Sequence, residues 1–331
     1  MKINLFYSEE FKRHQTDPYH PESPLRTEAI YKFLLNGPLK EEIVIRKPRK
    51  ASFEELCLVH TRDYLLSFEE FCLQGKSTFG GPDNQICFDT FEVASLAAGA
   101  GLEAVDLLQK GEKFAFSVVR PPGHHALPER ALGFCFLNNC ALAARYWISR
   151  YGVRKIAILD WDAHHGNGIQ EIFYEDPQVL YISLHEHPAR NFPGTGFPEE
   201  KGAGKGKGYN FNFPLPPEAK DDTYLGIFES QVLPLLEKFS PDGIIIACGF
   251  DAHRDDDLSF LNLTSWAFYQ MSFKLGEISA GLEAPVLSIL EGGYDLEALV
   301  VCAERHLAGL LEGYITLKNR ALRYKVPGMG K

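Results

Sequence analysis

Acidic and imidazole side chains are concentrated in the segment DWDAHHGNG, residues 160–168, directly after a short apolar run at 156–159. The apolar run is predicted to be a buried strand. Asp160, Asp162 and His164 alternate along the chain, and alternate residues of an extended segment point to the same face. Two carboxylates and two imidazoles are unfavourable if left unpaired beside an apolar strand. We therefore expect this segment to bind one cation; the alternative is a solvated loop that caps a helix.

The best ligand set for that cation is Asp162, His164 and Asp251, the last from the segment GFDAHRDDD. Three protein ligands with open positions are typical of a catalytic zinc site, whereas structural zinc sites are closed by four. Two carboxylates and one imidazole without a thiolate also suit Fe²⁺ or Mn²⁺, so these metals compete with zinc. Taken alone, Asp251 has a second interpretation, as the N-cap of a helix.

A pair of adjacent histidines, His124 and His125, follows a stiff Pro-Pro-Gly turn. A different neighbour behind each imidazole can tune the two rings separately, so that one is a neutral base while the other stays protonated. Asp160 and Asn167 are the candidate neighbours. The pair is therefore predicted to transfer protons.

Tyr294 follows two glycines, Gly292 and Gly293, which let the backbone approach a bound group closely. A hydroxyl at this position can donate to a developing oxyanion, and one such donor contributes about 3–4 kcal/mol. The alternative is a tyrosine that packs after a turn.

Strand-length apolar runs alternate with helical stretches over much of the chain. The runs lie at 114–119, 156–159, 179–184, 244–248 and 286–290, and helical stretches lie at 138–150, 221–239 and 264–280. Earlier candidates are strands at 3–7 and 43–46 and helices at 27–35, 52–58 and 91–110. Segments 8–26 and 71–90 contain prolines or glycines that predict irregular structure. The alternation predicts an α/β fold with a mostly parallel sheet and helices on both faces.

Each of the five later runs is followed by a polar cluster. The clusters are RPPGHH, DWDAHHGNG, HEH, GFDAHRDDD and EGGYD, in chain order. Because the carboxyl ends of parallel strands share one edge of the sheet, where open α/β sheets bind ligands, we expect the clusters to converge.

Composition excludes several classes of protein. The chain has 331 residues and a net charge of −10, which argues against the basic face that nucleic-acid binding needs. No apolar run reaches the roughly 18 residues of a membrane span, and the N-terminus reads as a strand and not as a signal peptide. The 7 cysteines lack CxxC pairs and are predicted to be reduced thiols in the cytoplasm. No linker or repeat marks a domain boundary.

Two segments resemble functional motifs without meeting their requirements. GAGKGKG, residues 202–208, lacks the GxxxxGK[ST] spacing of a phosphate loop and does not join a strand to a helix, so a flexible basic loop is predicted. The histidines of HEH, residues 185–187, either bind metal or pack at the end of a strand.

RPPGHH, DWDAHHGNG, NFPGTG, GFDAH and EGGY, in this order and spacing, resemble the histone deacetylase family, on its class II side. The resemblance extends from about residue 19 to residue 311. That zinc-dependent family also includes acetylpolyamine amidohydrolases and acetoin-utilization proteins. It implies one catalytic domain over residues 1–331 with the arginase-like α/β fold, in which a mostly parallel sheet of about eight strands has helices on both faces.

The resemblance also implies a role for each matching residue. Asp162, His164 and Asp251 match the ligands of one zinc ion, and His125 matches the general base. His124 matches its electrostatic partner, with Asp160 behind it. Asn167 stands behind His125 where class I enzymes have an aspartate, and asparagine is the usual class II residue. Tyr294 matches the tyrosine that stabilises the transition state.

Further matches concern substrate and potassium. The residues matched to substrate binding are Gly133, Phe134 and Phe192 in the tunnel wall, Gly292, Gly293 and Leu258 near the metal, and Asp83 at the rim. Arg26 matches an arginine of the internal cavity. The inner K⁺ site would use Asp160, Asp162, His164, Ser183 and Leu184, and the outer one Phe173, Asp176, Val179 and Tyr209.

The activity implied is hydrolysis of an N-acyl amide, foremost deacetylation of N6-acetyl-lysine in a protein or peptide. An acetylpolyamine deacetylase is the first alternative. Polyamine specificity often comes with an acidic gatekeeper, which at this position is the apolar Leu258, although Asp255, Asp256 and Asp257 stand close by. A non-catalytic acyl-lysine-binding protein is a second alternative. A dinuclear arginase-like hydrolase is a third, but DAHHG lacks the second carboxylate of the DxHxD pattern.

Overall fold

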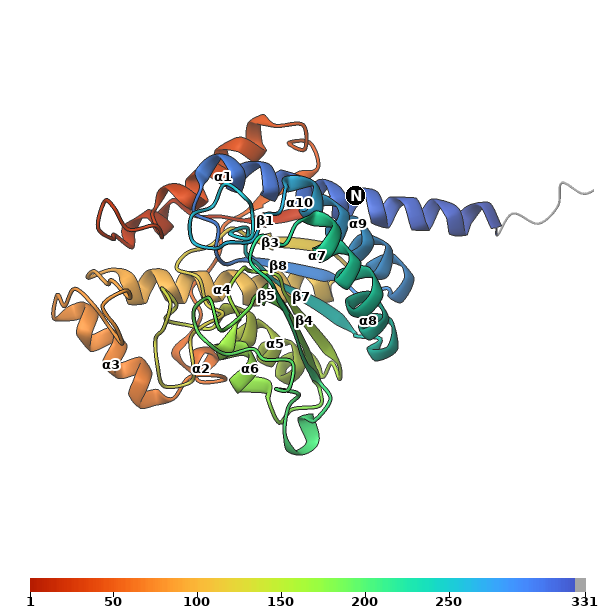
Figure 1. Cartoon of the computed structure of the whole chain (residues 1–331). Helices are drawn as coiled ribbons and strands as arrows, with labels where there is room; N and C mark the ends of the chain where they lie inside the picture. The colour runs from red at the N-terminus through yellow and green to blue at the C-terminus, as the bar shows by residue number, and fades with distance from the viewer. Residues whose placement is uncertain (325–331) are drawn as a thin grey trace, which may run out of the picture.

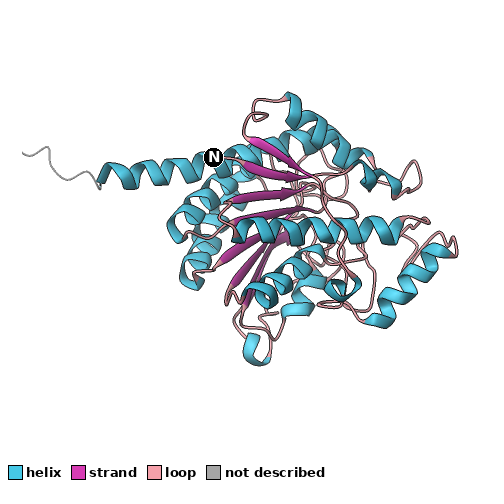
Figure 2. Ribbon diagram, turned by 180° about the vertical axis from the view of Figure 1, so that it is seen from behind, coloured by secondary structure: helices cyan, strands magenta, loops and turns pink. Residues whose placement is uncertain are grey.

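The computed structural model describes residues 1–324, which contain one sheet of eight strands (Figures 1 and 2). The strands are β1 Ile3–Phe6, β2 Ile43–Arg46, β3 Phe114–Ser117, β4 Ile156–Asp160, β5 Val179–Glu186, β6 Asn210–Leu215, β7 Gly243–Cys248 and β8 Val286–Leu290. Every neighbouring pair in this sheet is parallel. The predicted α/β fold with a parallel sheet is confirmed.

The strand order is β2-β1-β3-β8-β7-β4-β5-β6. The two strands latest in the chain, β7 and β8, therefore lie between β3 and β4. Every residue of β3, β4, β7 and β8 is buried, as expected for parallel strands covered on both faces. The four central strands form the apolar middle of the core.

Helices cover the two faces of the sheet in two layers (Figures 1 and 2). One layer contains α4 Thr90–Gln109, α5 Asn139–Tyr151 and α6 Asn167–Phe173, with α2 Phe53–Leu56 and α3 Arg62–Leu73 beside them. The other contains α1 Leu25–Asn36, α7 Asp221–Ile227, α8 Leu233–Phe239, α9 Ser265–Leu282 and α10 Leu296–Tyr324. None of the helices within residues 1–324 combines the length and the apolar character that crossing a bilayer requires.

Several elements differ from the sequence prediction. β6, α3, α6 and α10 were not predicted, and the predicted helix at 221–239 is divided by a π-helical turn at Phe228–Val232. A 3₁₀ helix, Glu9–Arg13, interrupts the segment that was predicted to be irregular. β6 has three buried and three half-buried residues and contains two asparagines and Pro214, so its sequence lacks the apolar run that marks the central strands.

All seven cysteines are free thiols, and five of them are buried, as the sequence predicted.

Candidate active site

Four loops meet at the carboxyl edge of the central strands. They follow β3, β8, β7 and β4, which are consecutive neighbours in the sheet, and they carry His124 and His125, Tyr294, Asp251, and Asp162 with His164. The predicted third cluster differs, because His185 and Glu186 belong to β5 itself. His185 there bonds Ser183 Oγ through Nδ1 (2.7 Å) and the Gly196 carbonyl through Nε2 (2.9 Å), which is a packing role.

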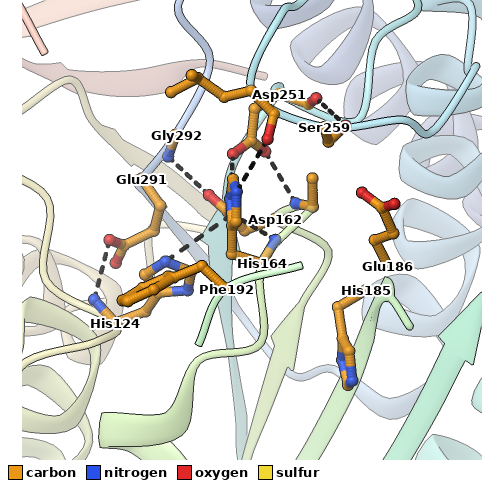
Figure 3. A network of polar contacts seen from close by, with 12 residues as sticks. His124, Asp162, His164, His185, Glu186, Phe192, Asp251, Ser259, Glu291 and Gly292 are labelled. Atoms are coloured by element: carbon orange, nitrogen blue, oxygen red, sulfur yellow. Dashed lines mark hydrogen bonds and ion pairs between the residues drawn. The ribbon is translucent and has the colours of Figure 1, made fainter. Parts of the chain in front are cut away.

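Asp162, His164 and Asp251 form a buried cluster (Figure 3). His164 Nδ1 lies 2.9 Å from Asp251 Oδ2 and 3.1 Å from Asp162 Oδ1. The other oxygen of each carboxylate accepts a backbone N–H bond, from Ala163 for Asp251 and from Gly292 for Asp162, each at 2.8 Å. One oxygen of each carboxylate is therefore held by a backbone N–H, and the other faces the imidazole. Asp162 Oδ1 also accepts from the His164 N–H (2.9 Å).

The three side chains fit a divalent cation. Their candidate ligand atoms all lie within 4.8 Å of one another. His164 Nε2 donates to the Leu258 carbonyl (3.2 Å), which directs Nδ1 toward the carboxylates. Burial and the Asp162 charge raise the pKa of Asp251 to about 7. Burial opposes protonation of His164, but hydrogen bonds to Asp162 and Asp251 hold its pKa well above the usual value. A bound divalent cation would replace that proton.

The two adjacent histidines have different partners. His124 Nδ1 donates to Asp160 Oδ2 (3.2 Å), which also accepts from the Tyr181 hydroxyl (3.0 Å). His125 Nδ1 donates to Asn167 Oδ1 (2.8 Å), since an amide oxygen can only accept. The Nε2 atom of His125 is therefore the unprotonated nitrogen when the ring is neutral.

These surroundings separate the protonation of the two rings. Burial alone would lower the pKa of His124, but the Asp162 and Asp160 carboxylates raise it to about 10. Burial and the positive charge of His124 hold the pKa of His125 well below its usual value. At neutral pH the pair is thus one imidazolium and one neutral imidazole, with ring centroids 3.9 Å apart.

Tyr294, the last residue of the EGGY segment, lines the same cavity as His125. The Arg26 guanidinium lies over its ring, 4.7 Å from the centroid. Burial holds the pKa of the Tyr294 phenol well above its usual value, so the hydroxyl keeps its proton and can donate it in a hydrogen bond. A Cβ atom at Gly292 would lie 2.6 Å from Asp162 Oδ2, so only glycine fits there.

A cavity of about 260 Å³ leads to these groups. It is lined by Asp83, His125, Gly133, Phe134, His164, Asn191, Phe192, Leu258 and Tyr294. Five of the seven residues assigned to substrate binding are in this wall, whereas Gly292 and Gly293 are not. A Cβ atom at Gly133 would come 2.8 Å from Phe192 Cε1, so the cavity is narrow between these two residues.

Some functional residues were missed by the sequence analysis. Glu291, the first residue of EGGY, is fully buried, and its Oε2 accepts the backbone N–H groups of Gly123 (2.6 Å) and His124 (3.0 Å). Burial raises the pKa of Glu291 to about 7. The two hydrogen bonds from Gly123 and His124 to Glu291 fix the loop that carries the histidine pair. The EGGY motif was recognised in the sequence, but no role was predicted for Glu291. Its backbone partners, Gly123 and His124, lie about 170 residues away in the chain, and local patterns do not reveal such a contact.

Arg26, which was matched to an internal cavity, is fully buried and bonds Glu22 Oε1 (3.1 Å) and the Gly293 carbonyl (2.6 Å). Glu22 also binds Arg120 through both carboxylate oxygens, at 2.9 and 2.7 Å. Arg26 thus joins this buried charged group to the EGGY segment through the Gly293 and Glu291 carbonyls.

The residues assigned to potassium lie in two groups. For the inner set, Asp160 is paired in register with Ser183 on the neighbouring strand, and the Leu184 carbonyl accepts from the Tyr224 hydroxyl (3.1 Å). For the outer set, Phe173, Asp176 and Val179 span the connection from α6 to β5, and Tyr209 precedes β6. Asp176 forms an ion pair with Arg145.

A family model for the histone deacetylase domain matches residues 20–310. The chain belongs to the histone deacetylase family. It is 37% identical over 328 residues to a probable deacetylase of Archaeoglobus fulgidus, and the alignment covers 95% of this chain and 87% of that protein. It is 38% identical over 285 residues to a histone deacetylase-like amidohydrolase of Pseudomonas aeruginosa, with 86% and 74% covered.

The crystal structure of the HDA15 HD domain superposes on this chain with a TM-score of 0.87. The two share 32% sequence identity, and the match covers 98% of this chain and 95% of that one. The predicted family and the predicted class of enzyme, a deacetylase or amidohydrolase, are both confirmed.

Proposed function

We propose that this histone deacetylase family member hydrolyses N6-acetyl-lysine in a protein or peptide with the help of one zinc ion. The observation that supports this most directly is the narrow cavity that leads to His125, His164 and Tyr294. A cavity of about 260 Å³ with Phe134 and Phe192 in its wall suits the aliphatic chain of an acyl-lysine. Asp83 is exposed and lines this cavity, and in this proposal it accepts N–H bonds from a substrate backbone.

Asp162, His164 and Asp251 would hold the zinc ion, and Fe²⁺ is the competing metal for this donor set. When bound, the ion supplies Lewis-acid chemistry, which lowers the pKa of a coordinated water toward 7 and polarises a carbonyl. The fixed carboxylate oxygens and the bond from His164 to the Leu258 carbonyl preorganise the three ligands.

His125 acts as the general base in this proposal. Its bond to Asn167 holds the Nδ1 proton, so Nε2 can take a proton from the attacking water. His124, charged beside Asp160, places a positive charge next to the forming oxyanion. A histidinium of this pair then gives a proton to the leaving amine, and the products are acetate and a free lysine amine.

Tyr294 donates its hydroxyl hydrogen to the tetrahedral oxyanion. We expect Tyr294→Phe to lower kcat about 10²–10³-fold, since this is the usual effect of losing one such donor. Zinc content and thermal unfolding of the variant should match the parent. The measurement is acetate release from an acetyl-lysine peptide by zinc-reconstituted protein, with Tyr151→Phe, a tyrosine at the far end of α5, as the matched control. A Tyr294→Phe kcat within about threefold of the parent would show that this role is wrong.

An acetylpolyamine deacetylase is the second candidate. Asp255 and Asp257 are exposed beside Leu258, so a cationic substrate would meet negative charge near the cavity. Leu258 itself, an apolar residue, stands in the wall. Comparing kcat/KM on N8-acetylspermidine and on an acetyl-lysine peptide separates the two candidates. Turnover of neither substrate, with measurable peptide binding, would favour a non-catalytic acyl-lysine-binding protein.

We also propose that residues 1–331 act as one catalytic domain, and that the two residue groups described above bind structural K⁺. The first group adjoins Asp160 and the second lies at the connection from α6 to β5.

A further inference from the structure

The peptide unit between Gly293 and Tyr294 is held at both of its polar ends. The Gly293 carbonyl accepts from Arg26 Nε (2.6 Å), and the Tyr294 N–H donates to Asp256 Oδ2 (2.6 Å). Gly293 has φ +111° and follows Gly292, so the chain before the tyrosine has little intrinsic preference for one orientation. The two contacts therefore set the plane of this peptide, and the plane sets the direction of the Tyr294 Cα–Cβ bond.

Asp256 is buried, and its carboxylate accepts its hydrogen bonds from backbone N–H groups. The residue is 5% exposed, and its Oδ2 also accepts from the Asp295 N–H (3.1 Å) while Oδ1 accepts from the Leu258 N–H (3.1 Å). Within the described part of the chain it forms no ion pair with a lysine, arginine or histidine. A buried carboxylate is unfavourable unless it is well hydrogen-bonded, so its presence here calls for a structural reason.

The neighbours of Asp256 in sequence show that this burial is specific. Asp255 and Asp257 are exposed, and only the middle acid of the three turns inward. Asp256 is not in the wall of the cavity, so it is not placed to touch substrate. Its contacts lead instead to the backbones of two residues that are in that wall, Tyr294 and Leu258.

We propose that Asp256 is a positioning residue, which holds Tyr294 in the orientation that points its hydroxyl at the reacting carbonyl. Arg26 holds the same peptide from its carbonyl side. This inference rests on the role proposed for Tyr294. It assigns to the middle acid of the DDD segment a function that its neighbours do not share.

The test combines variants of Asp256 with Tyr294→Phe in a double-mutant cycle. In the parent, Asp256→Ala should lower kcat about 10–100-fold with KM within about threefold, because misplacing a catalytic group by about 1 Å has an effect of this size. Asp256→Asn should lower kcat less, since its amide oxygen can still accept from Tyr294. Asp222→Ala, at an exposed acid on α7 that is not in the cavity wall, is the control and should retain the parent kcat.

In the Tyr294→Phe background, Asp256→Ala should lower kcat less than about twofold further, because the hydroxyl it positions is already gone. An equal loss in both backgrounds would overturn the proposal and give Asp256 a merely structural role. An unchanged kcat in Asp256→Ala would overturn it as well.

Zinc content and thermal unfolding, measured on every variant, show whether the fold and the metal site survive. A crystal structure of Asp256→Ala should show the Tyr294 ring displaced or in more than one position; a single unchanged ring position in this variant would contradict the proposal. If Asp256→Ala does not fold, the Asn variant carries the cycle. If Tyr294→Phe keeps the parent kcat, the role proposed for Tyr294 is wrong, and so is this inference. If Tyr294→Phe is inactive but the Asp256 variants are fully active, only the inference is wrong.

Discussion

The two adjacent histidines illustrate how neighbours determine the chemistry of identical side chains. His124 faces the carboxylate of Asp160, and His125 faces the amide of Asn167. Burial lowers both pKa values, but the carboxylates of Asp162 and Asp160 raise that of His124, whereas the positive charge of His124 lowers that of His125 further, so the two pKa values move in opposite directions. A proton can therefore be accepted on one ring while the other stays charged.

Replacing His125 by alanine should remove the general base without disturbing the metal ligands. We expect kcat to fall about 10²–10⁴-fold, the usual contribution of general-base catalysis, with zinc content unchanged. Acetate release and metal analysis of the purified variant are the measurements. His187→Ala, at a half-buried histidine that does not line the cavity, is the control. Loss of zinc from His125→Ala would instead place this residue among the ligands.

At the scale of elements, His306 connects the last three parts of the fold. It lies on α10, is fully buried, and bonds Ser272 Oγ of α9 and Ser288 Oγ of β8, each at 2.7 Å. Burial lowers the pKa of His306 to about 3. Glycines allow the same two helices to approach closely, because a Cβ atom at Gly309 or Gly313 would collide with the backbone of α9.

The His306 pKa predicts a pH-dependent contribution to stability. Between pH 6.5 and about 3, the unfolded chain binds a proton at this histidine that the folded chain does not. The contribution of the neutral, buried His306 to the free energy of unfolding is therefore fully present above pH 6.5. It decreases as pH falls, by about 1.4 kcal/mol per pH unit.

The free energy of unfolding of the parent and of His306→Gln, measured by urea denaturation from pH 7 to pH 5, checks this value. The variant should lose that part of the pH slope, since glutamine keeps a donor and an acceptor but does not titrate. Equal slopes for the two proteins would contradict the assignment.

At the scale of the whole molecule, the proposed metal links strands that are distant in sequence. Its candidate ligands come from the loops after β4 and β7, and Gly292 after β8 fixes one of them. A ligand that binds only the folded chain stabilises it by mass action.

Chelation should therefore lower the thermal unfolding temperature, and adding zinc should restore it. With free zinc about 1,000-fold above Kd, the gain is about 4 kcal/mol, or roughly 6 °C for a chain of this length. Differential scanning calorimetry of chelator-treated and zinc-reconstituted protein measures the difference. Asp251→Asn should lose the response to zinc; a response that persists in this variant would place the bound zinc elsewhere.

The amino-acid sequence by itself determined most of the strands and helices around the site and the chemistry that their ends could carry. The apolar runs that became β3, β4, β7 and β8 were recognisable because strands buried on both faces need continuous apolar residues. The side chains at their carboxyl ends were recognisable because acids and imidazoles rarely stand beside such runs without a partner. β6 and α10 were not recognisable in the same way: one is an edge strand with mixed burial, and the other follows directly on the EGGYD segment.

Only the tertiary structure decided which of these ends meet. Five similarly apolar strands can be ordered in many ways, and the order observed inserts β8 and β7 between β3 and β4. That order places the loop of His124 beside the loop of Tyr294, and the loop of Asp251 beside that of Asp162. The bonds from Glu291 to the His124 backbone and from Asp256 to the Tyr294 backbone follow from it. Local residue patterns do not predict such contacts. Each contact joins a side chain to a backbone group that is distant in sequence, and only the packed sheet brings the two together.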